Sequence, residues 1–415
     1  MMNSTAMQDD RFANRPLHTL FVITSMPVGG AETLLVELVR RFDRWRICPE
    51  ICCLKELGTL GTQLDLELPV HAHLIRHKYD VAVIHRLKRL IQRRGIDAVV
   101  TVGAGDKMFW GRIAAKFADT PVVLAALHST GWPDGVGRLN RTLTPWTDCF
   151  IAVAEPHRRY LVEEEHFPAE KVHVIPNGVD TERFRPDAEA RRAVRHELQI
   201  DEQAPLIGIV AALRPEKNHI LFVSAARRIA TQLPAARFLI IGDGPERSVI
   251  ERAVDDADLT EQCLLLGTRT DVPRLLAALD VFVLTSVQEA NPVSILESLA
   301  TGTPVVATRV GSVPETVRDG LTGYTVDPGD AAQIALRTTY LATNRQSARQ
   351  MGHNGRSLVV RNWSLDKMVR GYERLIHDVY RSKVTLARAS QTLTFGKTVA
   401  ATTAYPVGAG SKDGE

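Results

Sequence analysis

The segment around residue 290 holds the most informative chemical groups in the sequence. Glu289 lies in a loop after the apolar run that ends at Thr285, and Glu297 lies eight residues later in the next helical stretch. Two carboxylates at this spacing can present acceptors to one polyhydroxyl ligand, and free amides at a helix start can bind phosphate. The residues between them with which we expect such a ligand to make contact are Asn291, Pro292, Val293 and Ser294. The alternative is that Glu297 is an exposed residue of an amphipathic helix, and spacing alone leaves that open.

A second group of interest is cationic. Arg214 and Lys217 follow the predicted strand Pro205–Leu213 and precede a helical stretch. An arginine forks onto phosphate oxygens and a lysine supplies a point charge, so the pair suits a diphosphate. A solvated polar loop is the usual interpretation of a lone basic cluster. Ligands of open α/β sheets, however, gather at the carboxyl ends of strands, where this loop lies.

A third feature is the pair Gly29-Gly30, placed between the first predicted strand and the helix that follows it. Glycines let a backbone approach a ligand closely, and the helix start offers unpaired amides to an anion. Many α/β proteins use Gly-Gly here for steric reasons alone, so this pair is weak evidence by itself.

Parallel strands with crossover helices should position these groups, because short apolar runs alternate with amphipathic stretches along the chain. The sequence predicts an α/β fold with two doubly wound, Rossmann-like domains. In the first half the predicted strands are His18–Ser25, Ile47–Leu54, Asp97–Gly103, Pro121–His128, Cys149–Ala154 and Val172–Pro176, with helices near 31–42, 82–94, 107–118 and 156–165. In the second half they are Pro205–Leu213, Arg237–Gly242, Cys263–Gly267, Val281–Thr285, Pro304–Thr308 and Gly323–Val326.

Length and patterning set the expected domain limits. A chain of 415 residues is too long for one ordinary core. We predict a first domain over 16–185, a second over 186–363 and a helix over 364–384 that returns to the first domain. Segments 1–15 and 385–415 lack apolar periodicity and are predicted to be disordered.

Composition excludes several classes of protein. The net charge is only +3, which argues against a nucleic-acid binder. The five cysteines match no zinc spacing and fit a reducing cytoplasm. Asp256-Ala257-Asp258 has the spacing of a metal-binding motif but is interpreted as a solvated helix end, so no metal is expected. The sequence shows neither a secretion signal nor an apolar run long enough to cross a membrane.

Read in order, several segments resemble the family 4-type retaining glycosyltransferases, which have the GT-B fold. The resemblance covers about residues 20–380. Its motifs are Gly29-Gly30-Ala31-Glu32, the run from Val174 to Phe184, Pro215-Glu216-Lys217-Asn218, Ile241-Gly242-Asp243-Gly244-Pro245, the stretch Glu289 to Glu297, Gly311-Ser312-Val313-Pro314-Glu315 and Gly320-Leu321-Thr322-Gly323.

The resemblance implies roles for particular residues. Glu297 would grip the ribose of a nucleotide sugar, Glu289 would sit beside the transferred sugar, and Lys217 would bind the diphosphate. The amide of Gly30 would approach the phosphates when the domains close, and His128 would border the sugar and the acceptor. As a lone histidine at a strand end, His128 would otherwise be interpreted as structural. Further expected donor contacts are Gly29, Arg214, Gly242 and Thr268.

The sequence departs from the family pattern at two positions. The arginine that usually precedes the lysine is replaced by Ala212, and Arg214 is the candidate to take its place. Ala290 stands where a glycine is usual after the first glutamate.

The resemblance also implies a reaction. A sugar would pass from a nucleoside diphosphate, UDP or GDP, to a glycan or lipid-linked acceptor with retention of anomeric configuration and without a cofactor or metal. An NAD-dependent oxidoreductase is disfavoured because no strand leads into Gly-x-Gly-x-x-Gly with a following acid. A GT-B epimerase and a non-catalytic sugar-binding protein are the remaining alternatives.

The segment 84–94 mixes apolar residues with a cluster of cations. One interpretation is a peripheral contact with anionic lipid at the inner face of the membrane, and the other is a surface helix packed on its sheet.

Overall fold

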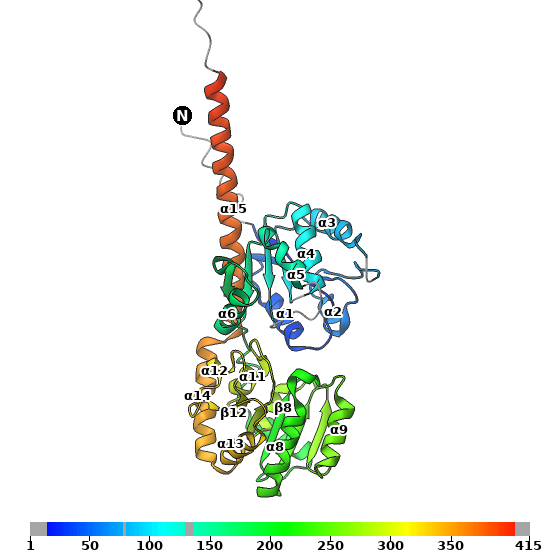
Figure 1. Ribbon diagram of the computed structural model, residues 1–415, viewed down its shortest axis with the longest axis vertical. Coiled ribbons are helices and arrows are strands. Elements are labelled where there is room, and N and C mark those ends of the chain that lie inside the picture. The colour runs from blue at the N-terminus through cyan, green and yellow to red at the C-terminus, as the bar shows by residue number, and fades with distance from the viewer. Residues whose placement is uncertain (1–14, 78–79, 104, 129–136, 403–415) are drawn as a thin grey trace, which may run out of the picture.

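The computed structural model describes residues 15–77, 80–103, 105–128 and 137–402. Within them lie two parallel sheets, one of seven strands and one of six, each flanked by helices. The two sheets belong to two Rossmann-like domains, stacked along the long axis of the molecule (Figure 1). This confirms the fold class that the sequence predicts.

The first domain contains the seven-stranded sheet, with strand order β3-β2-β1-β4-β5-β6-β7. Its strands are β1 (Leu17–Ile23), β2 (Ile47–Cys53), β3 (Val70–His71), β4 (Ala98–Val102), β5 (Val122–Ala126), β6 (Cys149–Ala152) and β7 (Val172–Val174). Its helices are α1 (Gly30–Arg41), α2 (Gly58–Leu64), α3 (Val83–Arg94), α4 (Asp106–Phe117), α5 (Gly137–Thr142) and α6 (Glu155–Glu163). Every residue of β4, β5 and β6 is buried, as expected for parallel strands covered by helices on both faces.

The second domain contains the six-stranded sheet, with strand order β10-β9-β8-β11-β12-β13. Its strands are β8 (Leu206–Val210), β9 (Arg237–Ile241), β10 (Cys263–Gly267), β11 (Val281–Leu284), β12 (Val305–Thr308) and β13 (Gly323–Val326). Its helices are α7 (Ala188–Glu197), α8 (His219–Gln232), α9 (Arg247–Asp256), α10 (Val272–Ala278), α11 (Val293–Ala300), α12 (Val313–Thr316), α13 (Ala331–Thr343) and α14 (Arg345–Asn362).

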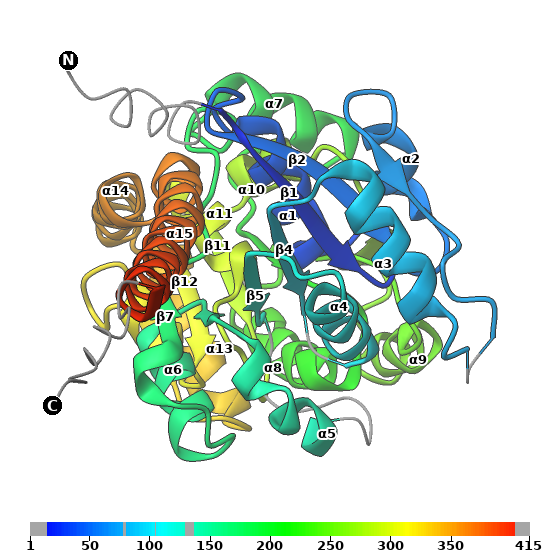
Figure 2. The ribbon, with the colours of Figure 1, turned by 90° about the horizontal axis from the view of Figure 1, so that it is seen from above.

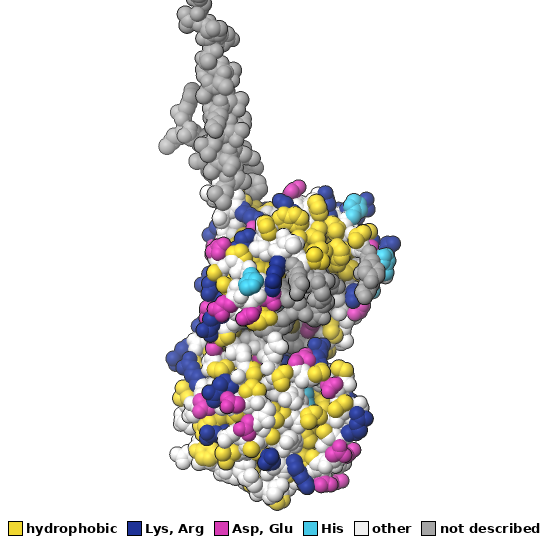
Figure 3. Space-filling model, in the orientation of Figure 1, with side chains coloured by type: hydrophobic (Ala, Val, Ile, Leu, Met, Phe, Trp, Pro, Cys, Tyr) yellow, Lys and Arg dark blue, Asp and Glu magenta, His cyan; other side chains and the backbone are white. Residues whose placement is uncertain are grey.

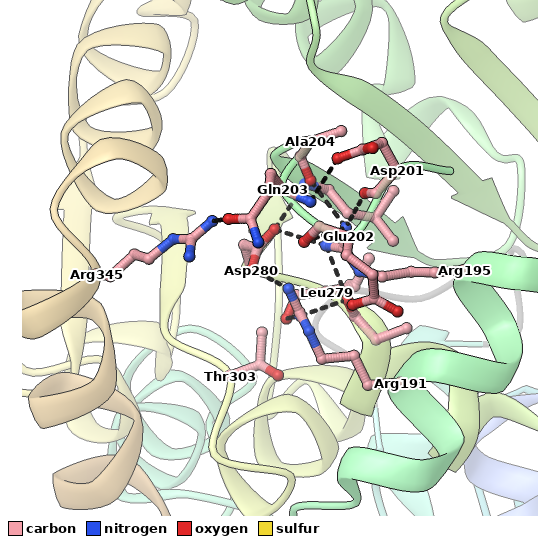
Figure 4. A network of polar contacts seen from close by, with 12 residues as sticks. Arg191, Arg195, Asp201, Glu202, Gln203, Ala204, Leu279, Asp280, Thr303 and Arg345 are labelled. Carbon is pink, nitrogen blue, oxygen red and sulfur yellow. Dashed lines mark hydrogen bonds and ion pairs between the residues drawn. The ribbon is translucent and has the colours of Figure 1, made fainter. Parts of the chain in front are cut away.

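A partly buried polar network fixes α7, the first helix of the second domain, to the sheet (Figure 4). Arg195 is fully buried; it donates to Asp280 Oδ2 at 2.8 Å and to the carbonyl oxygen of Ala204 at 2.9 Å. Arg191 donates to the other carboxylate oxygen of Asp280 at 2.7 Å. Pairing of this kind satisfies charges that burial would otherwise penalise, so the network anchors the start of the domain.

The chain crosses between the domains twice, and the two crossings lie side by side. Val179 in the first crossing donates to the carbonyl oxygen of Trp363 at 2.9 Å, and Leu365 in the second donates back to that of Val179 at 2.9 Å. After the second crossing, α15 (Leu365–Thr402) runs along the first domain and rises beyond it (Figures 1 and 2). Its apolar residues, among them Met368, Tyr372 and Ile376, join the core of that domain.

Three differences from the predicted elements have local causes. The short elements β3, α2 and α5 were not expected because they are too brief to produce a periodic pattern. Helix α15 continues to Thr402, so the first part of the predicted disordered segment 385–415 is helical. Arg15, at the end of the predicted disordered segment 1–15, forms a two-point ion pair with Asp97. Residues 1–14 and 403–415 lie outside the described residues.

Candidate active site

The predicted site residues of the second domain lie in loops at one edge of its sheet. Lys217 follows β8 and Glu289 follows β11, and these strands are neighbours in the sheet. Loops at the carboxyl ends of adjacent parallel strands meet, which explains how residues 72 positions apart come together. The waist between the domains, where this edge faces the first domain, is visible as a narrowing of the surface in Figure 3.

Lys217 and Glu289 are in direct contact. The lysine Nζ lies 2.6 Å from Glu289 Oε1, and Ser286 Oγ donates to the same oxygen at 2.7 Å. Glu289 is buried, whereas Lys217 is half-buried in the 3-10 turn Pro215–Lys217. Among the described residues both contacts fall on Oε1, which leaves Oε2 for a ligand. A buried carboxylate held in this way is oriented before any ligand binds.

Backbone contacts hold the loop that carries Glu289. Val287 donates to the carbonyl oxygen of Glu216 at 2.9 Å, which ties this loop to the lysine turn. Gly311 has φ +51°, and a Cβ there would lie only 1.6 Å from the carbonyl oxygen of Glu289. A glycine is therefore required at 311 for the two loops to pack together.

Glu297 lies on α11 and is half-buried, so it is not the exposed surface residue that the alternative interpretation requires. Burial of its carboxyl raises its pKa to about 7, although the nearby charge of Arg183 acts in the opposite direction. No described residue hydrogen bonds to this carboxylate. A desolvated, unpaired carboxylate is unfavourable unless a ligand supplies donors, and hydroxyl groups do so.

The segment before α11 also meets the first domain. Asn291 is buried, and its carbonyl oxygen accepts a hydrogen bond from Asn177 Nδ2 at 2.9 Å. Val293 packs against the core cluster of the first domain. Pro292 is the N-cap of α11, so the amides of Val293 and Ser294 begin the helix and have no helical partner.

The structure places Arg214 on the surface beside this site. Its side chain is exposed and makes neither an ion pair nor a hydrogen bond within the described residues. Ala212 is also exposed. Neither position has a structural partner that would hold it away from a ligand, so a phosphate role for Arg214 stays a prediction.

The predicted glycines differ in what the fold demands of them. A Cβ at Gly242 would lie 2.0 Å from the carbonyl oxygen of Ala211, so the fold itself requires this glycine. A Cβ at Gly30, the first residue of α1, would meet nothing within 4 Å. Gly29 is extended, with φ −160°, and is the N-cap of α1. Thr268 is exposed, one residue after β10.

His128 lies in the first domain, two residues after β5. It lines a small apolar pocket with residues of α1 and α15, including Leu34, Leu38 and Tyr372. Burial, together with the charges of His157 and Lys107, lowers the pKa of His128 to about 4. The imidazole is therefore neutral near pH 7. The structure does not bring it into contact with Glu289 or Lys217.

The sequence analysis assigned no role to two residues of the site. Ser286 orients Glu289 by a hydrogen bond. Asn177, which belongs to the first domain, donates a hydrogen bond to the loop that contains Asn291 in the second domain. Ser286 follows a strand in the same loop as Glu289, which was a usable signal. Asn177 is 114 residues away in sequence from its partner, and nothing local indicated the contact.

Comparison with known families identifies the family to which the two domains belong. The Glycosyltransferase Family 4 model matches residues 28–183, and the model of Glycosyl transferases group 1 matches residues 190–358. Together the two models account for most of both domains, including every site residue described above. This chain belongs to the family 4-type glycosyltransferases with the GT-B fold.

Similar glycosyltransferases include one from Escherichia coli, a UDP-Gal:alpha-D-GlcNAc-diphosphoundecaprenol alpha-1,3-galactosyltransferase. It is 26% identical over 366 residues, covering 86% of this chain and 88% of that protein. A GDP-mannose-dependent alpha-(1-6)-phosphatidylinositol monomannoside mannosyltransferase of Mycobacterium tuberculosis is 29% identical over 297 residues, covering 68% and 76%. The crystal structure of Anabaena HepE in complex with UDP and glucose has a TM-score of 0.78 at 20% identity, covering 87% of this chain and 100% of that one.

The segment 84–94, for which a membrane contact and packing on the sheet were both open, forms most of α3 of this glycosyltransferase. The buried residues of α3 are Val83, Leu87 and Ile91, so this side of the helix packs in the domain and does not face outward. Arg86 pairs with Asp80, and Arg94 pairs with Glu50. No helix among the described residues is long and apolar enough to cross a membrane.

Proposed function

We propose that this glycosyltransferase transfers a sugar with retention from a nucleoside diphosphate sugar to a glycan or lipid-linked acceptor, as a step in polysaccharide or glycoconjugate synthesis. The observation that carries the proposal is the contact of Lys217 with Glu289 in a buried loop beside the start of α11. It sets a cation, a carboxylate and free helix amides side by side. A non-catalytic binding protein would not need that combination.

Each part has a distinct task in the proposed reaction. Positive charge develops at the anomeric carbon while negative charge grows on the departing diphosphate. Lys217 and the first amides of α11 stabilise the diphosphate, because fixed donors aimed at developing charge lower the barrier. Glu289 orients the sugar and stabilises the positive centre through Oε2, without forming a covalent bond. Glu297 accepts hydrogen bonds from the ribose hydroxyls.

The reaction needs no metal or cofactor in this proposal, because protein groups neutralise the leaving group. The acceptor would occupy the first domain, with the neutral His128 at its border and the amide of Gly30 approaching the phosphates as the domains close. UDP and GDP sugars are the proposed donors. Support comes from the relatives named above, which act on a UDP-sugar and on GDP-mannose.

The anomeric outcome tests the proposal. The purified protein would be incubated with UDP-glucose, UDP-galactose, UDP-N-acetylglucosamine and GDP-mannose and a panel of acceptors, and the product examined by proton NMR. We expect an α-linked product from an α-linked donor. A β-linked product would contradict retention, and release of no nucleotide from any donor would contradict the enzyme assignment.

A peripheral membrane contact through α3 is a further part of the proposal. Because the apolar side of this helix is buried, only its cations support that contact. Lys88, Arg89 and Arg93 are free of ion pairs within the described residues, and the two arginines are exposed. Vesicles of phosphatidylglycerol should sediment the protein at low salt, and a variant with all three cations changed to glutamine should stay in solution. Equal behaviour of the two proteins would rule the contact out.

A further inference from the structure

The segment to which the proposed function assigns the donor phosphates is hydrogen bonded to the place where the chain crosses between the domains. Asn177 directly precedes the first crossing, and its side-chain amide donates to the backbone carbonyl oxygen of Asn291 at 2.9 Å. Both residues are buried, so water does not compete for this hydrogen bond. The bond connects the end of the first domain to the loop that leads into α11.

The first crossing, which directly follows Asn177, is tightly constrained. A Cβ at Gly178 would lie 2.7 Å from Cα of Leu365, so the two crossings approach as closely as backbones allow. The amide of Gly178 lies 3.3 Å from the sulfur of Met368 on α15. Together with the paired bonds of Val179, these contacts hold the two crossings against each other, and we therefore take this segment as the hinge of any rotation between the domains.

On its other side Asn291 is held by the second domain. Its Nδ2 lies 3.3 Å from Ser312 Oγ, in the loop that also packs on Glu289. The next peptide leads through Pro292 into the first free amides of α11. Fixing the carbonyl of Asn291 therefore fixes the peptide plane from which those amides are aimed. A displacement of about 1 Å at such a site costs about a hundredfold in rate.

We propose that Asn177 is a positioning residue, which holds the phosphate-binding start of α11 in register with the interdomain hinge. This inference rests on the proposed function, because it assigns the α11 amides to a nucleoside diphosphate. Since Asn177 sits at the pivot, its hydrogen bond survives domain rotation. The amides of α11 keep their aim while the first domain, with Gly30, swings toward the donor.

The test uses Asn177→Ala and Asn177→Asp, the second of which keeps the shape but turns a carboxylate toward the carbonyl oxygen. Asn354→Ala is the matched control, because Asn354 Nδ2 donates to the carbonyl oxygen of Leu321 at 3.0 Å, away from the hinge. Hydrogen–deuterium exchange of the peptide covering 286–298 is measured without ligand. Affinities for UDP, GDP, UMP and GMP are then measured by calorimetry.

We expect both Asn177 variants to exchange faster in this peptide and to bind the preferred diphosphate about tenfold more weakly, with a smaller loss for the monophosphate. The control should match wild type in both measurements. Unchanged exchange in the Asn177 variants, or faster exchange with unchanged diphosphate affinity, would overturn the proposal. Faster exchange in a protein that binds no nucleotide would support the coupling to the hinge and contradict the proposed donor class instead.

Discussion

At the scale of single residues, the site depends on how the charges of Lys217, Glu289 and Glu297 are paired. Lys217 and Glu289 neutralise each other across 2.6 Å, so the ligand-free loop holds no isolated buried charge. Glu297 has no such partner, and its raised pKa records the cost. Ligand binding should therefore disturb Lys217 and Glu289 differently from Glu297, because the first two must exchange a mutual contact for contacts with the donor.

Replacing the carboxylates one at a time separates these roles. Glu297→Ala should weaken donor binding, because the ribose loses its acceptor. Glu289→Ala should lower the maximal rate more than it weakens binding, because its contact strengthens only as charge develops. Steady-state kinetics with calorimetric donor affinities measures both effects. Wild-type kinetics for both variants would contradict the roles assigned to Glu289 and Glu297.

The two cations to which the proposed function assigns the diphosphate allow a sharper comparison. Lys217→Ala and Arg214→Ala should each slow turnover by about a hundredfold or more, with the lysine variant slower, since a donor aimed at the leaving group contributes about 3 kcal/mol. Ala212→Arg, which restores the usual family residue, should partly rescue Arg214→Ala. A wild-type rate for Arg214→Ala would show that this exposed side chain points to solvent in the closed enzyme.

The pKa of Glu297 predicts a dependence on pH. Its carboxyl titrates near pH 7 in the folded protein, against a usual value of 4.5. Ribose hydroxyls bind best to the ionised form, so donor affinity should increase as the pH rises through about 7. Between pH 4.5 and about 7 the folded protein holds a proton that the unfolded chain has released, so this group's contribution to stability falls as pH rises.

Calorimetry from about pH 6 to pH 8 would measure the slope of donor affinity, and denaturant unfolding from about pH 4.5 to pH 8 would measure the slope of stability. Glu297→Gln is the control, because it keeps the shape of the side chain but cannot titrate. If wild type and this variant showed the same slopes, Glu297 would not be the titrating group.

At the scale of secondary structure, the loops at strand ends hold the site residues. Two glycines, Gly30 and Gly178, differ in how closely the surrounding backbone packs against them. A side chain at Gly30 would meet open space, whereas one at Gly178 would collide with the backbone of Leu365. Replacement by alanine should therefore reduce turnover at position 30 and reduce stability at position 178.

Gly30→Ala should fold with wild-type stability yet lose donor turnover, because the added methyl group occupies the space through which phosphates approach the α1 amides. Gly178→Ala should destabilise the protein by about 1–3 kcal/mol, the usual cost of forcing an extra carbon into a packed contact. Thermal unfolding and initial rates would distinguish the two. A loss of stability in Gly30→Ala would indicate that this glycine serves the fold.

Sequence reasoning succeeded where local pattern determines structure. The strands of both sheets that bear the site were predicted because continuous apolar runs mark buried parallel strands, and their order places Lys217 beside Glu289. It could not find Asn177, whose partner is set by domain packing, or show that Gly242 is required by the fold. The apolar stripe of α3 was ambiguous for the same reason, since periodicity does not reveal which surface covers it.

At the scale of the whole molecule, two domains face each other and are joined by the paired crossings, the second of which leads into α15 on the first domain (Figure 1). Under the proposed function, the groups that bind the donor lie on the second domain, and the α1 amides and His128 lie on the first. Closure about the hinge would complete the site and exclude water, which strengthens every charge interaction within it. Donor cleavage should therefore depend on groups contributed by both domains.

The slow release of nucleoside diphosphate from a nucleotide sugar tests whether donor cleavage depends on both domains. This assay needs no knowledge of the acceptor. Wild type, Glu289→Ala, Lys217→Ala and Gly30→Ala would be incubated with UDP- and GDP-linked sugars, and free UDP or GDP measured over hours. We expect release by wild type from at least one donor, and release lower by about a hundredfold in each variant, including the one in the first domain. Equal release by wild type and the three variants, or none from any donor, would contradict it.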